Sequence, residues 1–380
     1  MQLRKPSDIR AINRLRVLNL IRTQQGVSRA DISHELGINK PSCSEIVDNL
    51  IKEGIVTEGE KTETASGRRP TPLMIAKKRY LVAGISIGLR ICSIAISDLE
   101  GNVLGFKQIP TPQCPTPKDL FVLLVNDFQH MYRGDKKKLA GCVLSLSGRV
   151  ADNEITVEEL FEWGWKNVPF ARSLPAFLDC DCILVDETEA MVSAESLLSK
   201  EIPDSFLYLN WGEHIGATLV HGSQQDRSYL GHTRIANEGS CVCGGTGCLE
   251  TVSAGWAIEK NFGGKSLREL AQEKPAGFDR AMDTAALALG MEIAQTVAIT
   301  GLKKVILSGN IPTLQPSLVE RVTLAMRSSL PPFLQETEIV SSSLGDKARQ
   351  IGPVAVALDR FVFHQSLLAQ FQTNKNRYSH

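Results

Sequence analysis

Four side chains that can bind a metal ion lie close together between residues 232 and 248. His232 is followed by three cysteines, Cys241, Cys243 and Cys248. One imidazole and three thiolates form the ligand set of a closed, tetrahedral zinc site with a structural role. The glycines among the cysteines tolerate the turns that bring sulfur atoms together. Ordinary buried thiols in a glycine-rich turn are the alternative, but such dense spacing in a chain with nine cysteines favours the metal site.

The residues around these cysteines form a longer motif. His232 precedes a Cys-x-Cys-Gly-x-x-Gly-Cys-Leu-Glu run that begins at Cys241 and ends at Glu250. This motif resembles the signature of the ROK family, which groups sugar-responsive repressors with sugar kinases, and the resemblance extends over nearly the whole chain. It implies an α/β actin-like ATPase (ribonuclease H-like) body of two lobes. It also implies that zinc holds a loop beside the sugar pocket, with His232 and Glu250 near the effector.

A second group of acidic residues follows a buried strand. Asp186 and Glu187 stand where the kinase branch of the family reads Asn-Asp, and that Asp is the general base for the sugar hydroxyl. A glutamate in its place moves the carboxylate by about an ångström, which disrupts a positioned reaction. The resemblance therefore assigns Asp186 and Glu187 to effector binding, with Glu187 as a degenerate base. An acidic helix N-terminus stabilised by the helix dipole is the alternative.

The phosphate-binding turns of the kinase branch are altered in this chain. Where that branch reads Asp-x-Gly-Gly-Thr, this chain has Ser86 for the Asp, and Leu89 and Arg90 in the last two positions. Where it reads Gly-Thr-Gly-x-Gly, this chain has Gly212, Glu213, His214 and Gly216, so a carboxylate replaces the hydroxyl. A carboxylate facing a phosphate is repelled by it. These changes fall together on positions that face phosphate, so they disfavour an enzyme.

The N-terminal residues have the pattern of a helix-turn-helix. Apolar residues recur at helical spacing from Ile9 to Ile21, which predicts a first helix. Ser28 is the expected N-cap of a second helix, in which we expect Ala30 to face inward, and Asn39 is the N-cap of a third. Two helices joined by a glycine-containing turn are typical of DNA-binding heads.

The third helix and the segment after it would contact DNA. Short polar residues at the start of the helix suit base edges and phosphates. A strand that begins at Gly54, the polar loop after it and a returning strand at Pro72–Ile75 predict a wing. The arginines of its loop suit phosphates or a narrow minor groove. The residues expected to contact DNA are Lys40, Ser42, Ser44, Glu45, Arg68 and Arg69. This segment resembles the winged helix-turn-helix of the repressor branch, which the kinase branch lacks; a protein-interaction module of three helices is the alternative.

Composition predicts a globular chain of several domains. The 380 residues are 43% hydrophobic and 22% charged, with zero formal net charge, so DNA contacts must come from a local basic patch. The sequence lacks a signal-peptide pattern and an apolar run that could span a membrane, which favours the cytoplasm. We expect a DNA-binding domain at 1–76, a first lobe at 77–200, and a second lobe at 201–343 with the zinc site and a dimerisation surface. A closing helix at about 345–364 should pack back on the first lobe.

These patterns predict a transcriptional regulator, a repressor in this branch, that responds to a carbohydrate or sugar-phosphate effector. A two-fold dimer would bind an inverted repeat in operator DNA. An ATP-dependent sugar kinase of the glucokinase or N-acetylglucosamine kinase type is the main alternative, and a protein-interaction scaffold is another. The effector stays open, because Phe161 and Tyr229 replace two sugar contacts of the kinase branch. Arg90 or Arg149 would suit an anionic effector.

Overall fold

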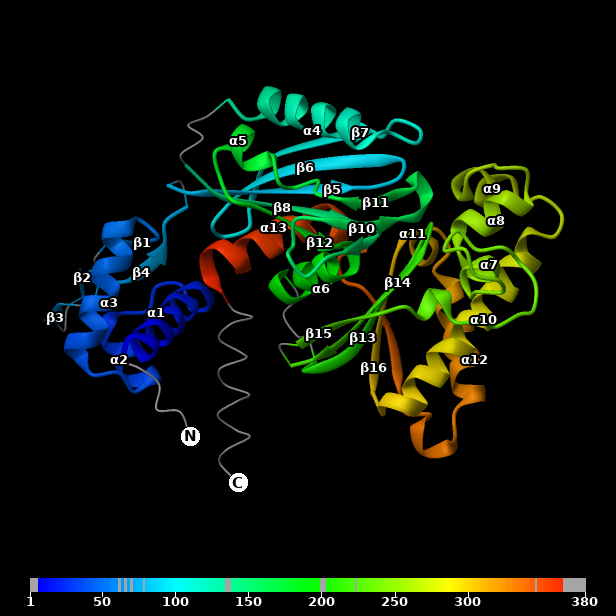
Figure 1. The fold of residues 1–380 in the computed structure, drawn as a ribbon. Coiled ribbons are helices and arrows are strands. Elements are labelled where there is room, and N and C mark those ends of the chain that lie inside the picture. The colour runs from blue at the N-terminus through cyan, green and yellow to red at the C-terminus, as the bar shows by residue number, and fades with distance from the viewer. Residues whose placement is uncertain are drawn as a thin grey trace.

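The computed structural model describes residues 6–60, 63–64, 67–68, 71–77, 79–133, 138–198, 203–222, 224–345 and 347–364. Figure 1 shows an N-terminal head at one side of a body that consists of two lobes. Within these ranges, no helix combines the length and the apolar character needed to cross a membrane.

Three helices and a small wing form the head. The helices are α1 (Pro6–Thr23), α2 (Arg29–Leu36) and α3 (Lys40–Glu53). In the wing, β1 (Val56–Glu58) pairs with β4 (Leu73–Ile75), and β2 (Glu63–Thr64) pairs with β3 (Gly67–Arg68), both antiparallel. The predicted caps are confirmed, because the side chains of Ser28 and Asn39 accept hydrogen bonds from Asp31 N and Ser42 N.

One expectation for the head is wrong. Ala30 is exposed, whereas Ile32, two residues further along α2, is fully buried. Successive residues of an α-helix are about 100° apart, so two residues separated by two positions point to nearly opposite sides. A helix as short as α2 therefore buries only the face that carries Ile32.

Each lobe contains a five-stranded sheet, and the two sheets have equivalent strand orders. The orders are β12-β8-β5-β6-β7 in lobe 1 and β15-β14-β13-β16-β17 in lobe 2. In each sheet, the three strands that come first in the sequence (β5, β6 and β7, or β13, β14 and β15) pair antiparallel. The two later strands (β8 and β12, or β16 and β17) pair in parallel on the other side of β5 or β13. This is the duplicated actin-like arrangement that the resemblance implies.

Lobe 1 adds helices and a small second sheet to its main sheet. Its elements are β5 (Leu81–Ile87), β6 (Ile91–Asp98), β7 (Val103–Pro110), α4 (Pro117–Met131), β8 (Leu139–Leu146), β9 (Arg149–Val150), β10 (Val157–Leu160), η2 (Phe161–Trp163), β11 (Trp165–Val168), α5 (Leu174–Leu178), β12 (Cys182–Asp186) and α6 (Glu187–Leu198). Strands β9, β10 and β11 pair antiparallel and were not predicted. The strands β5 and β8 are buried along almost their whole length, as expected where helices cover both faces of a sheet.

Lobe 2 carries the metal-binding loop and a group of helices. Its elements are β13 (Ser205–Trp211), β14 (Ile215–His221), β15 (Gln224–Ser228), η3 (Leu230–His232), α7 (Glu250–Ser253), α8 (Gly255–Asn261), α9 (Leu267–Glu273), α10 (Phe278–Thr300), β16 (Lys304–Ser308), α11 (Asn310–Leu314), α12 (Ser317–Ser329), η4 (Pro332–Leu334) and β17 (Glu338–Ser341). As predicted, α10 ends at Gly301, which has the positive φ of a C-cap.

The last helix joins lobe 1 to the head. Helix α13 (Lys347–Leu358) continues as one π-helical segment, η5 (Asp359–Phe363). It packs so closely on β5 that a Cβ at Gly84 would lie 2.6 Å from Val354 N. At its end, Asn19 Nδ2 donates a hydrogen bond of 2.9 Å to Phe363 O, and Arg22 lies over the Phe363 ring. Buried side chains of the head, lobe 1 and this segment form one continuous hydrophobic cluster.

Candidate metal centre and effector cavity

The four predicted metal ligands converge at one point in lobe 2. The ligand atoms of His232, Cys241, Cys243 and Cys248 all lie within 4.8 Å of one another. Cys243 Sγ is 3.8 Å from Cys248 Sγ, and Cys241 Sγ is 3.6 Å from His232 Nδ1. Bonds of about 2.3 Å to sulfur and about 2.05 Å to nitrogen would separate tetrahedral ligands by about 3.8 and about 3.6 Å. The residues therefore fit a tetrahedral metal ion.

The backbone of this loop depends on glycine at the positions that bring the sulfur atoms together. Gly247 has a φ of 71°, and a Cβ there would lie 1.8 Å from Ala236 O. Gly245 N donates a hydrogen bond of 3.4 Å to Cys243 Sγ, which directs the sulfur toward the other ligands. A side chain at either glycine would displace the sulfur atoms.

A cavity of about 500 Å³ lies between the two lobes and borders the metal ligands. Residues from both lobes line it, and the predicted effector residues are all among them: Asp186, Glu187, His232 and Glu250. Phe161 and Tyr229, which replace two sugar contacts of the kinase branch, also line it. The sequence pattern thus identified side chains that share one cavity.

The carboxylates at the start of α6 are already paired with arginines. Asp186 accepts a hydrogen bond of 2.8 Å from Thr188 N and lies 3.2 Å from an Arg227 nitrogen. Glu187 is buried and forms an ion pair with Arg349 of α13. Part of the hydrogen-bonding capacity of each carboxylate is therefore already used, and a sugar hydroxyl could donate only to the remaining lone pairs.

His214 forms a partly buried bridge between the lobes. Its Nε2 lies 3.2 Å from Glu162 Oε1 in lobe 1, and its Nδ1 lies 3.3 Å from Glu250 Oε2 in lobe 2. Burial alone would lower the pKa of His214, but the hydrogen bond to Glu250 and the nearby negative charges outweigh it and raise that pKa to about 9. His214 is therefore a cation at neutral pH. Glu162 was not predicted, because nothing local in the sequence links it to His214.

The pKa values of the two carboxylates beside His214 shift in opposite directions. Burial raises the pKa of Glu162. Burial also favours the neutral form of Glu250, but the hydrogen bond and the charge of His214 lower the pKa of Glu250 below its usual value. Glu250 further accepts hydrogen bonds from Ile215 N at 2.8 Å and Trp256 Nε1 at 3.1 Å. Its carboxylate is thus occupied by protein donors, so Glu250 positions His214 at the edge of the cavity.

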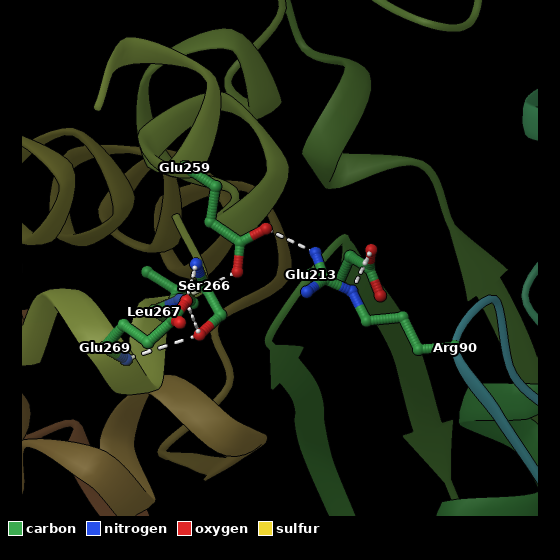
Figure 2. Close-up of polar contacts among 6 residues, drawn as sticks. All are labelled: Arg90, Glu213, Glu259, Ser266, Leu267 and Glu269. Carbon is green, nitrogen blue, oxygen red and sulfur yellow. Dashed lines mark hydrogen bonds and ion pairs between the residues drawn. The ribbon is translucent and has the colours of Figure 1, made fainter. Parts of the chain in front are cut away.

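An ion pair joins the turns at Arg90 and Glu213, which correspond to the phosphate-binding turns of the kinase branch. Arg90 Nε donates to Glu213 Oε1 at 3.0 Å, and Arg90 Nη2 donates to Glu259 of α8 (Figure 2). Glu259 is in turn held by Leu267 N at 2.8 Å, beside the Ser266 capping box of α9. Glu259 was not predicted as a partner of Arg90, because 169 residues separate them.

The arginines expected to suit an anionic effector are both paired with carboxylates. Arg90 bridges Glu213 and Glu259, and Arg149 Nη2 donates to Glu158 at 2.9 Å. An anion would have to compete with these carboxylates. Neither of these two arginines therefore offers an anion an uncompensated positive charge.

Four of the six predicted DNA-binding residues lie on α3. Lys40 and Glu45 on α3 are exposed, and Ser42 and Ser44 are half-buried. Glu45 lies 3.6 Å from Arg10 in an exposed ion pair, which is weak. Arg68 ends β3 of the wing, and Arg69 lies outside the described residues.

Comparison with known proteins relates the two parts of the chain to known families. A model of the ROK family matches residues 82–360, and a model of the winged helix-turn-helix DNA-binding type matches residues 10–57. The xylose repressor of Bacillus subtilis (strain 168) is 22% identical over 372 residues, which cover 93% of this chain and 97% of that protein.

Two solved structures share the fold. A ROK family transcriptional regulator, described as a homologue of the E. coli MLC protein, superposes with a TM-score of 0.79 at 21% identity, covering 95% of this chain and 99% of that one. A ROK family glucokinase from Streptomyces griseus, solved with glucose and AMPPNP, superposes with a TM-score of 0.60 at 18% identity, covering 73% of this chain and 98% of that one. Because the family model spans most of the chain and a winged helix-turn-helix precedes it, this protein belongs to the ROK family.

Proposed function

We propose that this chain is a ROK-type transcriptional repressor that binds operator DNA through its head and a carbohydrate in the cavity between its lobes. The observation that carries the proposal is the combination of a winged helix-turn-helix with a body in which the Arg90–Glu213 ion pair joins the phosphate-binding turns. Similarity to a xylose repressor over 93% of the chain supports it. Operator binding would place the protein in the cytoplasm.

In this proposal the four metal ligands hold a structural zinc ion. A Cys₃His set with tetrahedral separations suits zinc, and zinc bound there would stabilise the loop by coupling its folding to metal binding. His232 and Cys243 also line the cavity, so an ordered loop would give the cavity one of its walls. The ion would not act on the ligand.

The remaining site assignments follow the same division of the chain. Residues 1–76 would bind DNA through Lys40, Ser42, Ser44, Glu45, Arg68 and Arg69. Residues 77–200, with the closing helix at about 345–364, and residues 201–343 would form the lobes that enclose the effector. Within the cavity, Asp186 and Glu187 would accept hydrogen bonds from sugar hydroxyls, and His232 would donate one through the ring nitrogen that does not bind the metal. Glu250 would act through His214.

Response to the effector would require two linked copies. Helices α10 and α12 expose apolar side chains in lobe 2, among them Leu287 (52% exposed) and Leu324 (61%), and we assign this face to a second copy of the chain. Because the head shares a hydrophobic cluster with lobe 1, closure of the lobes would move the two heads and change their fit to an inverted repeat. Light scattering of Leu287→Glu should show loss of the dimer; a dimer that persists would place the contact elsewhere.

Binding to promoter DNA tests the proposal. Anisotropy titrations with fragments of the protein's own promoter region should show tighter binding than random DNA of the same length, and a panel of sugars should alter the promoter affinity. Equal affinity for both DNAs would favour a protein-interaction scaffold. A parallel incubation with ATP, magnesium and hexoses should yield no sugar phosphate above background; stoichiometric product would overturn the assignment as a non-enzyme.

A further inference from the structure

We propose that the effector is a neutral saccharide of two or more units, whose second unit lies beside the former phosphate-binding turns. This inference rests on the proposed function, because it concerns the ligand of the same sensor. A second cavity, of about 690 Å³, lies between the lobes next to the first. Ser147, Glu187, Asn210 and His214 line both cavities, so the two are contiguous. Each has the size of a ligand pocket on its own, ~300–1,000 Å³.

The second cavity is lined by neutral hydrogen-bonding side chains. They include Ser86, Ser93, Gln108, Asn310, Thr313 and Gln350. Ser93 is 4% exposed and its Oγ has no hydrogen-bond partner among the described residues. The buried Oδ1 of Asn310 likewise lacks a partner within the described part of the chain. Buried polar atoms are normally paired, so these two are explained if ligand hydroxyls bind there.

The charges of this cavity disfavour an anion. Three arginines and three glutamates line it, and they are Arg90, Arg268, Arg349, Glu187, Glu213 and Glu259. Arg90 is held by two of these glutamates (Figure 2), and Arg349 is paired with the third. Arg268 is exposed and takes part in none of these pairs. A phosphate that bound at Arg90 or Arg349 would have to break their ion pairs, and at Arg90 it would meet the carboxylate of Glu213. A sugar unit needs neither step, because its hydroxyls both donate and accept hydrogen bonds.

Titration calorimetry with matched sugars tests the inference. The probes are xylose against xylobiose, glucose against maltose and cellobiose, and N-acetylglucosamine against its β-1,4-linked dimer, with glucose 6-phosphate and ATP as anions. We expect one disaccharide to bind at least about tenfold more tightly than its monosaccharide, as a few added hydrogen bonds allow.

Variants of the second cavity locate the added unit. Gln108→Ala and Asn310→Ala should each weaken the disaccharide by about tenfold and leave the monosaccharide within about twofold. Gln272→Ala, at an exposed position on α9, is the matched control and should change neither affinity. Circular dichroism and promoter affinity report whether each variant is folded.

The possible results separate this inference from the proposed function. If monosaccharides bind as tightly as their dimers, or if an anionic probe binds more tightly than every neutral sugar, the inference is wrong and the regulator stands. If the disaccharide is preferred but neither cavity variant weakens it, the second unit lies elsewhere and the inference is also wrong. If neutral sugars and anionic probes alike fail to bind or to alter promoter affinity, the proposed function fails as well.

Discussion

The ion-pair bridge at His214 should make the stability of the body depend on pH. In the folded chain the pKa of His214 is about 9, against an ordinary value of 6.5. Because the folded-state pKa is the higher one, the stabilisation is complete below about pH 6.5 and is lost as the pH rises through about 9. The difference between 6.5 and about 9, at roughly 1.4 kcal/mol per unit, corresponds to about 3.5 kcal/mol for the complete effect.

Urea unfolding and NMR measure this effect. The free energy of unfolding of the unaltered protein should fall by about 3 kcal/mol between about pH 6.5 and about pH 9.5. His214→Gln keeps a polar side chain but cannot carry the charge, so it should be less stable at the lower pH and should lack this part of the decline. In NMR titrations, the resonance absent from His214→Gln should titrate near pH 9 in the unaltered protein.

His221→Gln is the control for this prediction. His221 ends β14 and is exposed, so the variant should retain the pH dependence of the unaltered protein. The reasoning is refuted if His214→Gln and the unaltered protein lose stability equally over this range. A His214 resonance that titrates near its ordinary pKa would refute it independently.

Three further substitutions test the metal site, the wing and the ion pair between the lobes. Cys243→Ser should lose zinc and have a lower unfolding temperature, because metal binding is coupled to folding. Elemental analysis measures the metal content, and Cys114→Ser, at an exposed thiol, is the control. Arg68→Ala should weaken promoter binding and reduce its salt dependence by about one counterion, and unchanged anisotropy titrations would reject the wing contact. Arg90→Ala removes the ion pairs to Glu213 and Glu259, which join the two lobes, so the lobes should separate and small-angle scattering should show a larger radius of gyration. A scattering profile identical to that of the unaltered protein would show that these ion pairs do not hold the lobes together.

Local patterns in the sequence predicted much of the fold. The apolar run from residue 80 to 98 became the hairpin of β5 and β6, and a similar run after residue 205 became β13 and β14. The metal cluster was also predictable, because its cysteines are close in sequence and their glycines allow tight turns. Such features depend on neighbours along the chain, which a sequence displays directly.

Contacts between distant segments were not predictable in the same way. The partners of Arg90 and His214 lie in different lobes, so their pairing depends on how the lobes pack. The expectation that Arg90 would suit an anion rested on its charge alone, whereas the structure pairs Arg90 with Glu213 and Glu259. The π-helical end of α13 has no simple sequence pattern, although it determines where the head docks.

The contact between α1 and the end of the chain has a practical consequence for studying the parts separately. Phe363 is almost fully buried, and Asn19 and Arg22 of the head cover its segment. Removing the first 76 residues would expose the apolar side chains of that docking face to water, and the truncated body would tend to self-associate. The isolated head would lose the same support for α1. Neither fragment would therefore reproduce the behaviour of the intact protein.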